Sequence, residues 1–132
     1  SDVCSSDLPR PNGEDMSHPE IVASTWKSLY GELEDWGLKP GADSGTPMTS
    51  GRVLKTWGNV ETGLWQCTPG GWMVENRPDE ESVIILAGRA RITDASGTVT
   101  EISEGSTVVF PQGWFGRWDV EETIVKYYVS IK

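Results

Sequence analysis

Three charged residues that lie close together in the chain, Glu75, Arg77 and Glu81, are the ones best suited to do chemistry. A guanidinium presents its N–H donors in a fork that matches carboxylate oxygens, so Arg77 suits either two buried carboxylates or an anionic or carbonyl-bearing ligand. A carboxyl group near a second carboxylate has a raised pKa, which favours a general base at neutral pH. Two interpretations stay open: a satisfied ion pair, or a ligand site in which Glu75 or Glu81 is the catalytic base.

Aromatic residues and one lysine extend this candidate site. The chain has seven tryptophans, and several aromatic side chains fall near the charged cluster or near the C-terminus: Trp65, Trp72, Trp114, Trp118, Tyr127 and Tyr128. Core packing is the ordinary role of such residues, and an aromatic wall for a planar or sugar-like ligand is the functional alternative. We take Trp65, Trp118, Tyr128 and Lys126 as candidate ligand-binding residues. Strand alternation puts Lys126 and Tyr128 on one face, and whether that face points inward stays open.

The segments that must position these residues are typical of β-strands. Short apolar or alternating runs follow one another, separated by turns rich in Gly and Pro. These runs are residues 52–57, 63–67, 72–77, 82–86, 89–93, 98–102, 106–110 and 123–131. Many short strands with almost no helix among them predict an all-β barrel or sandwich.

Before these strands, a helix is expected. Ser17 is a candidate N-cap, followed by an early Pro and by Glu20. Apolar residues then recur at spacings of three and four, which is the apolar face of a helix, and Gly37 ends it. We therefore divide the chain into a non-native or disordered tail (residues 1–15), an N-terminal helical segment (16–44) and a barrel (45–132). Residues 1–8 resemble the conceptual translation of a short-read sequencing adapter.

Charge and cysteine content restrict the partners and the compartment. The chain has 20 acidic and 11 basic residues, a net charge of −9. Nucleic acids and anionic membranes attract basic clusters, so we expect neither as a partner. No apolar stretch is long enough to span a bilayer and no signal-peptide pattern appears. Outside the tail Cys67 stands alone, which fits a reducing compartment, so we expect a cytoplasmic protein.

Two motifs identify the barrel more closely. Residues 105–116 place a strand between two tight turns, with Gly105, Pro111 and Gly113 at the turn positions. Upstream, Glu81 is followed after six residues by Gly88. Both patterns resemble the two sequence motifs of the cupins. Residues 63–70 and 110–128 further resemble the small-cupin family that includes the barrels of (S)-ureidoglycine aminohydrolase. The resemblance implies a cupin (double-stranded β-helix, jelly-roll) barrel and a homodimer.

The resemblance also implies which metal ligands of the cupins this chain lacks. Metal-binding cupins hold their metal with histidines and a glutamate, whereas this chain has one histidine, His18, before the barrel. Gly116 stands at the third histidine position, and Trp118 is expected to fill the space beside it. Glu75 and Arg77 stand at the first two positions, although the other spacing that the motif allows would place Val74 and Asn76 there. Because Arg cannot ligate a metal, we expect no metal and no other cofactor.

Two functions follow as hypotheses. The first is a barrel without metal that binds a small polar or anionic metabolite through Arg77, Glu75, Glu81 and the aromatic wall. The alternative is an enzyme related to ureidoglycine aminohydrolase, or a lyase or isomerase, that uses the barrel carboxylates as acid and base. The missing histidines favour the first, because the related aminohydrolase chemistry uses a metal.

Overall fold

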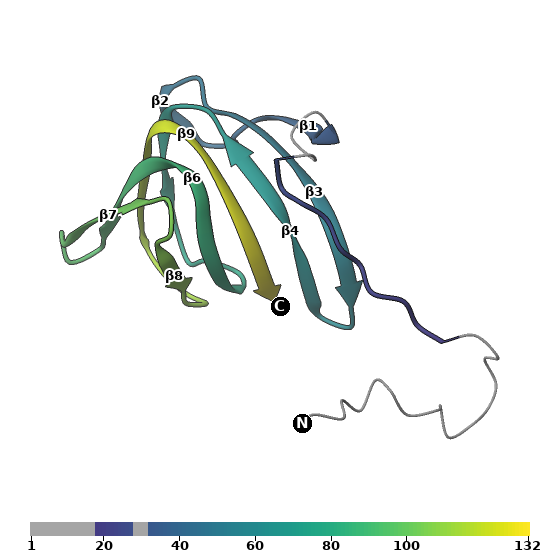
Figure 1. The fold of residues 1–132 in the computed structure, drawn as a ribbon. Helices are drawn as coiled ribbons and strands as arrows, with labels where there is room; N and C mark the ends of the chain where they lie inside the picture. The colour runs from purple at the N-terminus through teal and green to yellow at the C-terminus, as the bar shows by residue number, and fades with distance from the viewer. Residues whose placement is uncertain (1–17, 28–31) are drawn as a thin grey trace.

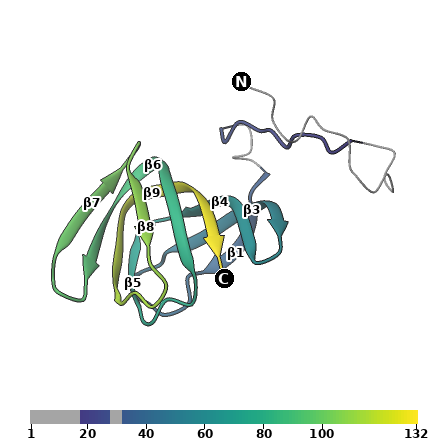
Figure 2. The same cartoon turned by 90° about the horizontal axis from the view of Figure 1, so that it is seen from below.

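The structure is a nine-stranded antiparallel sheet that curls into a barrel (Figures 1 and 2). It is a computed structural model, and it describes residues 18–27 and 32–132. The strands are β1 (Glu34–Leu38), β2 (Ala42–Gly45), β3 (Met48–Trp57), β4 (Val60–Cys67), β5 (Gly70–Val74), β6 (Glu80–Asp94), β7 (Val99–Ser103), β8 (Thr107–Phe110) and β9 (Gly116–Ile131). The all-β fold predicted from the sequence is confirmed.

The two longest strands, β6 and β9, form the centre of the sheet and pair with each other along most of their length. The first part of β9 also pairs with β5 and its second part with β4. On its other edge β6 pairs with β7 and β8. β3 and β1 extend the sheet beyond β4, and β2 extends it beyond β5. Because each long strand changes partners along its length, the sheet closes around an interior face.

A bulge at Gly88 allows β6 to run through as one strand where the sequence predicted two. Gly88 has a φ of 85°, and the register between β6 and β9 shifts on both sides of it. A Cβ atom at this position would lie 2.1 Å from the carbonyl oxygen of Thr123. Only glycine permits both this left-handed backbone and this close approach, so the bend in β6 depends on it.

The core lies between the curled walls and is rich in aromatic side chains. Trp118 and Phe110 are each 2% exposed, and Ile124 is fully buried. Alternate residues of β9 contribute to this interior, and they include Lys126 and Tyr128, each 6% exposed. The question that strand alternation left open is thereby answered: Lys126 faces into the barrel.

The predicted N-terminal helix is wrong for the residues that the structure describes. Residues 18–27 have no regular structure apart from a turn at 26–27, and residues 34–38 form strand β1, which pairs with β3. Gly37 was expected to end a helix. It instead lies at the end of a β-bulge, where the register between β1 and β3 shifts after Asp35. Pairing with an existing sheet edge outweighs the local apolar periodicity, which is a weak determinant over so few turns.

Two further expectations concern the expected helical segment of residues 16–44 and the expected tail of residues 1–15. Strands β1 and β2 join the sheet before residue 45, so the segment of residues 16–44 contributes to the barrel. Residues 1–15, expected to be a tail, lie outside the described residues. Within the described part of the chain, no helix has the length and apolar character needed to cross a membrane.

Candidate functional site

The interior of the barrel contains a cavity of about 390 Å³ between the aromatic core and a group of charged side chains. Strand β4 provides Glu61 and Trp65, β5 provides Trp72, and β6 provides Glu81. The remaining lining residues come from β9 and the residue after it, from the end of β5 and the segment between β5 and β6, and from the chain before β3: Trp118, Lys126, Tyr128, Ser130, Lys132, Val74, Arg77, Pro78, Asp79, Trp36 and Lys39. This volume suits a ligand of a few to about a dozen heavy atoms.

Glu81 is the centre of the charged wall. Its Oε1 accepts a hydrogen bond from Lys126 Nζ at 2.7 Å and lies 3.0 Å from Arg77 Nη2. The side chains of Glu81 and Lys126 are each 8% exposed, so both charges are largely removed from water. Burial lowers the pKa of Lys126, against the opposing effect of Glu81. One carboxylate is therefore shared by two cations.

Asp79 adds a second carboxylate beside Arg77. Its Oδ2 accepts a hydrogen bond from the hydroxyl of Ser130, and its Oδ1 lies 3.6 Å from Arg77 Nε. That distance is too long for a hydrogen bond, and the buried Nε of Arg77 has no hydrogen-bond partner among the described residues. Arg77 thus lies between two carboxylates with part of its donor capacity unused.

The aromatic wall is formed by stacked indole rings. Trp72 and Trp118 stack with centroids 5.6 Å apart and an interplanar angle of 9°, and Trp65 meets Trp118 edge-on at 5.6 Å. Lys126 Nζ lies 4.5 Å from the Trp65 ring centroid and 5.3 Å from that of Trp118. The aromatic wall and the charged wall therefore meet at the ammonium group of Lys126.

Lys39 is a member of the cavity that sequence reasoning missed. Its Nζ lies 5.5 Å from the Trp72 ring centroid, and no carboxylate among the described residues forms an ion pair with it. Burial lowers the pKa of Lys39, and the nearby charge of Arg77 lowers it further. It stands between two turn-forming segments, so neither strand alternation nor a motif indicated that it belongs to the site.

A hydrogen bond between two side chains lies at the same end of the cavity as Ser130. The Tyr128 hydroxyl donates to Glu61 Oε2 at 2.7 Å. Burial, with help from the negative charge of Glu61, raises the pKa of Tyr128, so the phenol stays protonated at neutral pH. Each of the three carboxylates that line the cavity therefore accepts a hydrogen bond from another side chain of the barrel: Glu61, Asp79 and Glu81.

The placement of Glu75 differs from expectation. Arg77 and Glu81 line the cavity, whereas Glu75 is exposed and does not. Strand β5 ends at Val74, and Asn76 has a φ of 49°, so the alternation that would put Glu75 and Arg77 on one face is broken between them. The result matches neither register considered from the sequence, because Val74 and Arg77 face in while Glu75 and Asn76 do not.

Gly116 is covered by a tryptophan, but not by the one expected. A Cβ atom at Gly116 would lie 2.1 Å from Cζ2 of Trp114, whose indole Nε1 donates to Asp94 Oδ1 at 2.7 Å. Trp118 lies deeper, among the stacked rings of the core. His18 is exposed, and no group of three metal-ligating side chains occurs within the described residues.

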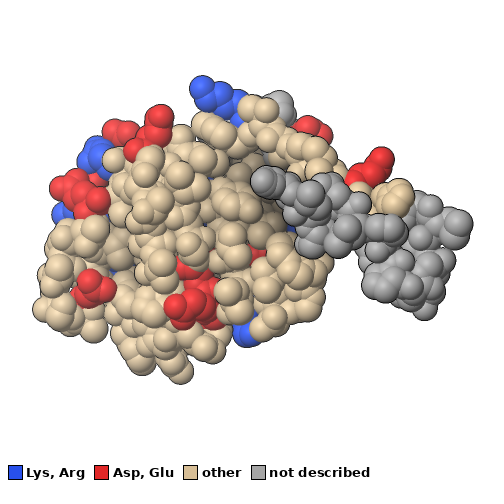
Figure 3. All heavy atoms as spheres, turned by 60° about the horizontal axis from the view of Figure 1, so that its bottom comes forward, with Lys and Arg blue, Asp and Glu red and all other residues tan. Residues whose placement is uncertain are grey.

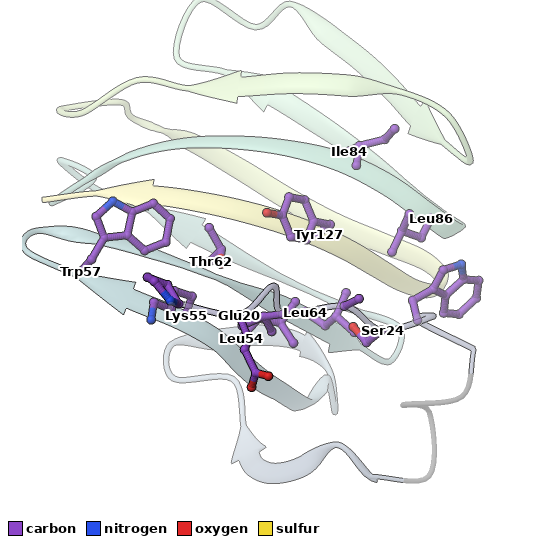
Figure 4. Close-up of a pocket in the computed structure, with 14 residues that line it drawn as sticks. Glu20, Ser24, Leu54, Lys55, Trp57, Thr62, Leu64, Ile84, Leu86 and Tyr127 are labelled. Atoms are coloured by element: carbon purple, nitrogen blue, oxygen red, sulfur yellow. The ribbon is translucent and has the colours of Figure 1, made fainter. Parts of the chain in front are cut away.

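A second hollow lies on the outside of the barrel (Figure 4). It has a volume of about 810 Å³ and is mostly apolar, with Leu64 of β4, Ile84 of β6 and Tyr127 of β9 on one side. Residues before β1, among them Glu20 and Ser24, form another part of its lining. It has few groups able to do chemistry, so the interior cavity is the stronger candidate.

The cavity reaches the end of the barrel at which the chain ends, because Ser130 and Lys132 line it (Figure 1). The space-filling view, with the bottom of Figure 1 turned forward, shows acidic side chains near the middle of the face and most basic ones toward its edges (Figure 3).

Comparison with known proteins agrees with this architecture. The family model of the EutQ-like cupin domain matches residues 54–128. No curated protein matches the chain. The solved structure of the Clostridium difficile EutQ protein is 16% identical with a TM-score of 0.57, covering 64% of this chain and 68% of that one. A putative ethanolamine utilization protein Q from Salmonella typhimurium LT2 is 16% identical with a TM-score of 0.59, covering 72% and 76%.

A third solved structure extends the likeness to a longer protein. A protein of unknown function of the DUF861 family from Pseudomonas syringae pv. tomato is 20% identical with a TM-score of 0.69. The match covers 74% of this chain but 43% of that one, so this chain spans less than half of its length. At these identities the likeness concerns the fold, and the cupin barrel predicted from the two motifs is confirmed.

Proposed function

Since this chain belongs to the family of EutQ-like cupin domains, we propose that its barrel binds a small carboxylate-bearing metabolite in the interior cavity. The observation that carries this proposal is Lys39, a partly buried ammonium group on the cavity wall that has no ion-pair partner among the described residues. A buried charge is costly unless it is paired. A ligand carboxylate between Lys39 and Arg77 would supply the missing partner.

The other charges of the cavity support an anion rather than a cation as the ligand. Glu61, Asp79 and Glu81 already accept hydrogen bonds from Tyr128, Ser130 and Lys126 respectively. Arg77, in contrast, has an unused Nε–H and approaches two carboxylates without a bidentate contact to either. The unsatisfied capacity of the site is therefore donor capacity, which a carboxylate satisfies.

The aromatic wall limits the rest of the ligand. Trp65 and Trp72 both line the cavity, with ring centroids 6.2 Å apart in an edge-to-face arrangement. Their faces offer an apolar surface for a short carbon skeleton, and the volume of about 390 Å³ lies at the lower end of the range for small-molecule sites. A metabolite of a few carbons with one or two carboxylates fits both walls.

Isothermal titration calorimetry with L-lactate, pyruvate and succinate tests the proposal. At least one of these acids should bind, and Lys39→Gln should weaken that binding by roughly tenfold or more, because a charged hydrogen bond contributes about 1.5–3 kcal/mol. Lys55→Gln is the matched control, since Lys55 lines the outer hollow instead. Absence of binding by all three acids, or equal affinities for the two variants, would contradict the proposal.

As a second candidate, we propose acid–base catalysis in the same cavity by an enzyme related to (S)-ureidoglycine aminohydrolase. The observation in its favour is that Glu81 is buried between Arg77 and Lys126, a position from which a carboxylate moves protons to and from a bound substrate. Ammonia release from (S)-ureidoglycine measures it. Release by the wild type that Glu81→Gln abolishes, in variant protein that tryptophan fluorescence shows to be folded, would support this function, and no release by the wild type with or without added Mn²⁺ would remove it.

We also propose that the protein acts as a homodimer in the cytoplasm, without a nucleic acid or a membrane as partner. The net charge of −9 supports the last two points. Analytical ultracentrifugation of the purified chain measures the oligomeric state, and a single species of monomer mass at micromolar concentration would contradict the dimer.

A further inference from the structure

We propose that Lys126 captures a carbonyl group, forming a reversible imine with a small 2-oxo acid held in the interior cavity. The inference rests on the proposed binding of a carboxylate and adds a covalent step to it. Of the cavity residues, Lys126 alone combines a primary amine with a hydrogen-bonded carboxylate, and both groups line the space that the ligand would occupy.

The surroundings of Lys126 favour a nucleophilic amine. Its Nζ is covered by the rings of Trp65, Trp118 and Phe110, at 4.5, 5.3 and 6.0 Å from their centroids. Two cations, Arg77 and Lys39, act with burial to lower the pKa of Lys126, while Glu81 opposes them. Desolvation and neighbouring cations are the conditions that give a lysine a reactive free amine.

Glu81 is placed to handle every proton of the reaction. It takes a proton from the Lys126 ammonium, and the free amine attacks the carbonyl carbon, so that a C–N bond forms and the carbonyl electron pair moves to oxygen. Glu81 returns that proton to the oxygen, and the amine nitrogen passes a second proton through Glu81 to the resulting hydroxyl. The C–O bond then breaks with release of water and leaves a protonated imine. An ammonium and a carbonyl are thereby converted to an iminium and water, with no oxidant or reductant consumed.

Two further cations of the cavity, Arg77 and Lys39, indicate the ligand class. Arg77 shares the Oε1 oxygen of Glu81 with Lys126, because its Nη2 lies 3.0 Å from that oxygen. Lys39 has no carboxylate partner among the described residues, as noted above. A carboxylate directly bonded to the reacting carbonyl would reach these cations while the carbonyl carbon met Lys126. That arrangement selects 2-oxo acids over simple aldehydes and over saturated acids.

The experiment traps the imine by reduction in the wild-type protein. Pyruvate and sodium cyanoborohydride are added, the protein is digested, and the modified lysines are located by mass spectrometry. Lys126 should carry severalfold more adduct than the exposed Lys55, because burial and the neighbouring cations favour its free amine. L-Lactate, which has the same carboxylate but no carbonyl, is the matched control and should give no adduct.

Two variants separate this step from binding. Lys126→Arg keeps the charge opposite Glu81 and should lose the specific adduct, whereas Lys39→Met keeps the reacting amine and should retain an adduct at Lys126 with a higher pyruvate requirement. Adduct spread evenly over Lys126 and Lys55, or none at all, overturns the imine. If calorimetry then still shows pyruvate or L-lactate binding that depends on Lys39, the binding function stands without it.

Discussion

Lys126 Nζ and Glu81 Oε1 lie 2.7 Å apart in the interior of the barrel, joined from two strands that pair directly with each other. Ile85, not Glu81, is the register partner of Lys126, so the two side chains reach along the sheet rather than across it. Their contact brings the charged wall of the cavity against the aromatic one. Binding, catalysis and much of the stability of the fold are predicted to depend on this pair.

Replacing Glu81 by Gln should strongly destabilise the protein. The change removes the charge that compensates both Lys126 and Arg77, and an uncompensated buried charge costs roughly 3–5 kcal/mol in free energy of unfolding. Urea denaturation followed by tryptophan fluorescence measures it. Glu75→Gln, at an exposed position, should change the free energy of unfolding by less than about 0.5 kcal/mol. Equal effects of the two substitutions would show that the interior ion pair contributes nothing.

The stability of the protein should fall at alkaline pH because of Cys67. Burial raises the pKa of the Cys67 thiol from its usual value of 9.0 to about 11. Between these values the unfolded chain has lost the proton and the folded chain retains it, so the free energy of unfolding decreases with pH by up to about 1.4 kcal/mol per unit. Denaturation of wild type and Cys67→Ala at pH 8 and pH 10.5 measures the difference. A variant as pH-sensitive as the wild type would contradict this assignment.

Gly116 and Trp114 should be energetically coupled. A methyl group at residue 116 would meet the Trp114 ring at 2.1 Å and the carbonyl oxygen of Thr93 at 2.5 Å. Gly116→Ala should therefore cost roughly 1–3 kcal/mol in the wild type, and distinctly less when Trp114 is replaced by Ala. A double-mutant cycle measures the coupling. Additive effects would mean that the indole ring yields freely and does not occupy the third histidine position of the cupin motif.

Replacing Glu61 by Gln should strengthen the binding of a small carboxylate. Glu61 lines the cavity and accepts a hydrogen bond from Tyr128, which a glutamine carbonyl also accepts, so the local structure is kept while one negative charge is lost. Removing a like charge from a partly buried site should lower the Kd by a few-fold. Calorimetry with L-lactate measures it, with the exposed Glu104→Gln as control. Weaker binding by the Glu61 variant would place the ligand elsewhere.

The N-terminal region shows where sequence patterns mislead. Apolar residues at helical spacing predicted a helix up to Gly37, yet Glu34–Leu38 pairs with β3. A spacing pattern records which residues share a face if a helix forms, but a free sheet edge offers hydrogen bonds to the same residues. The competing partner lies in a later part of the chain, so the local pattern contained no sign of it.

Some residues of the candidate site could be predicted from the sequence and others could not, and the reason differs from residue to residue. Arg77 and Glu81 were identified because they stand at ligand positions of the cupin motif and because a buried carboxylate needs a partner. Glu75 was placed with them by strand alternation, which fails where Asn76 adopts a left-handed backbone. Lys39 had no such signal, since it enters the cavity through the folding of a turn segment against Trp72.

The amino-acid sequence by itself determined that this protein is all-β, because turn residues and strand periodicity act over a few neighbouring residues, and its two motifs resembled those of the cupins. It also determined which chemistry is available, a set of carboxylates, cations and indoles without metal-binding histidines around them. Only the tertiary structure decided which face of β9 is the interior, that Lys126 meets Glu81, and that Lys39 completes the cavity. Those outcomes depend on contacts between distant parts of the chain, and a strand's two faces are equivalent until its neighbours are in place.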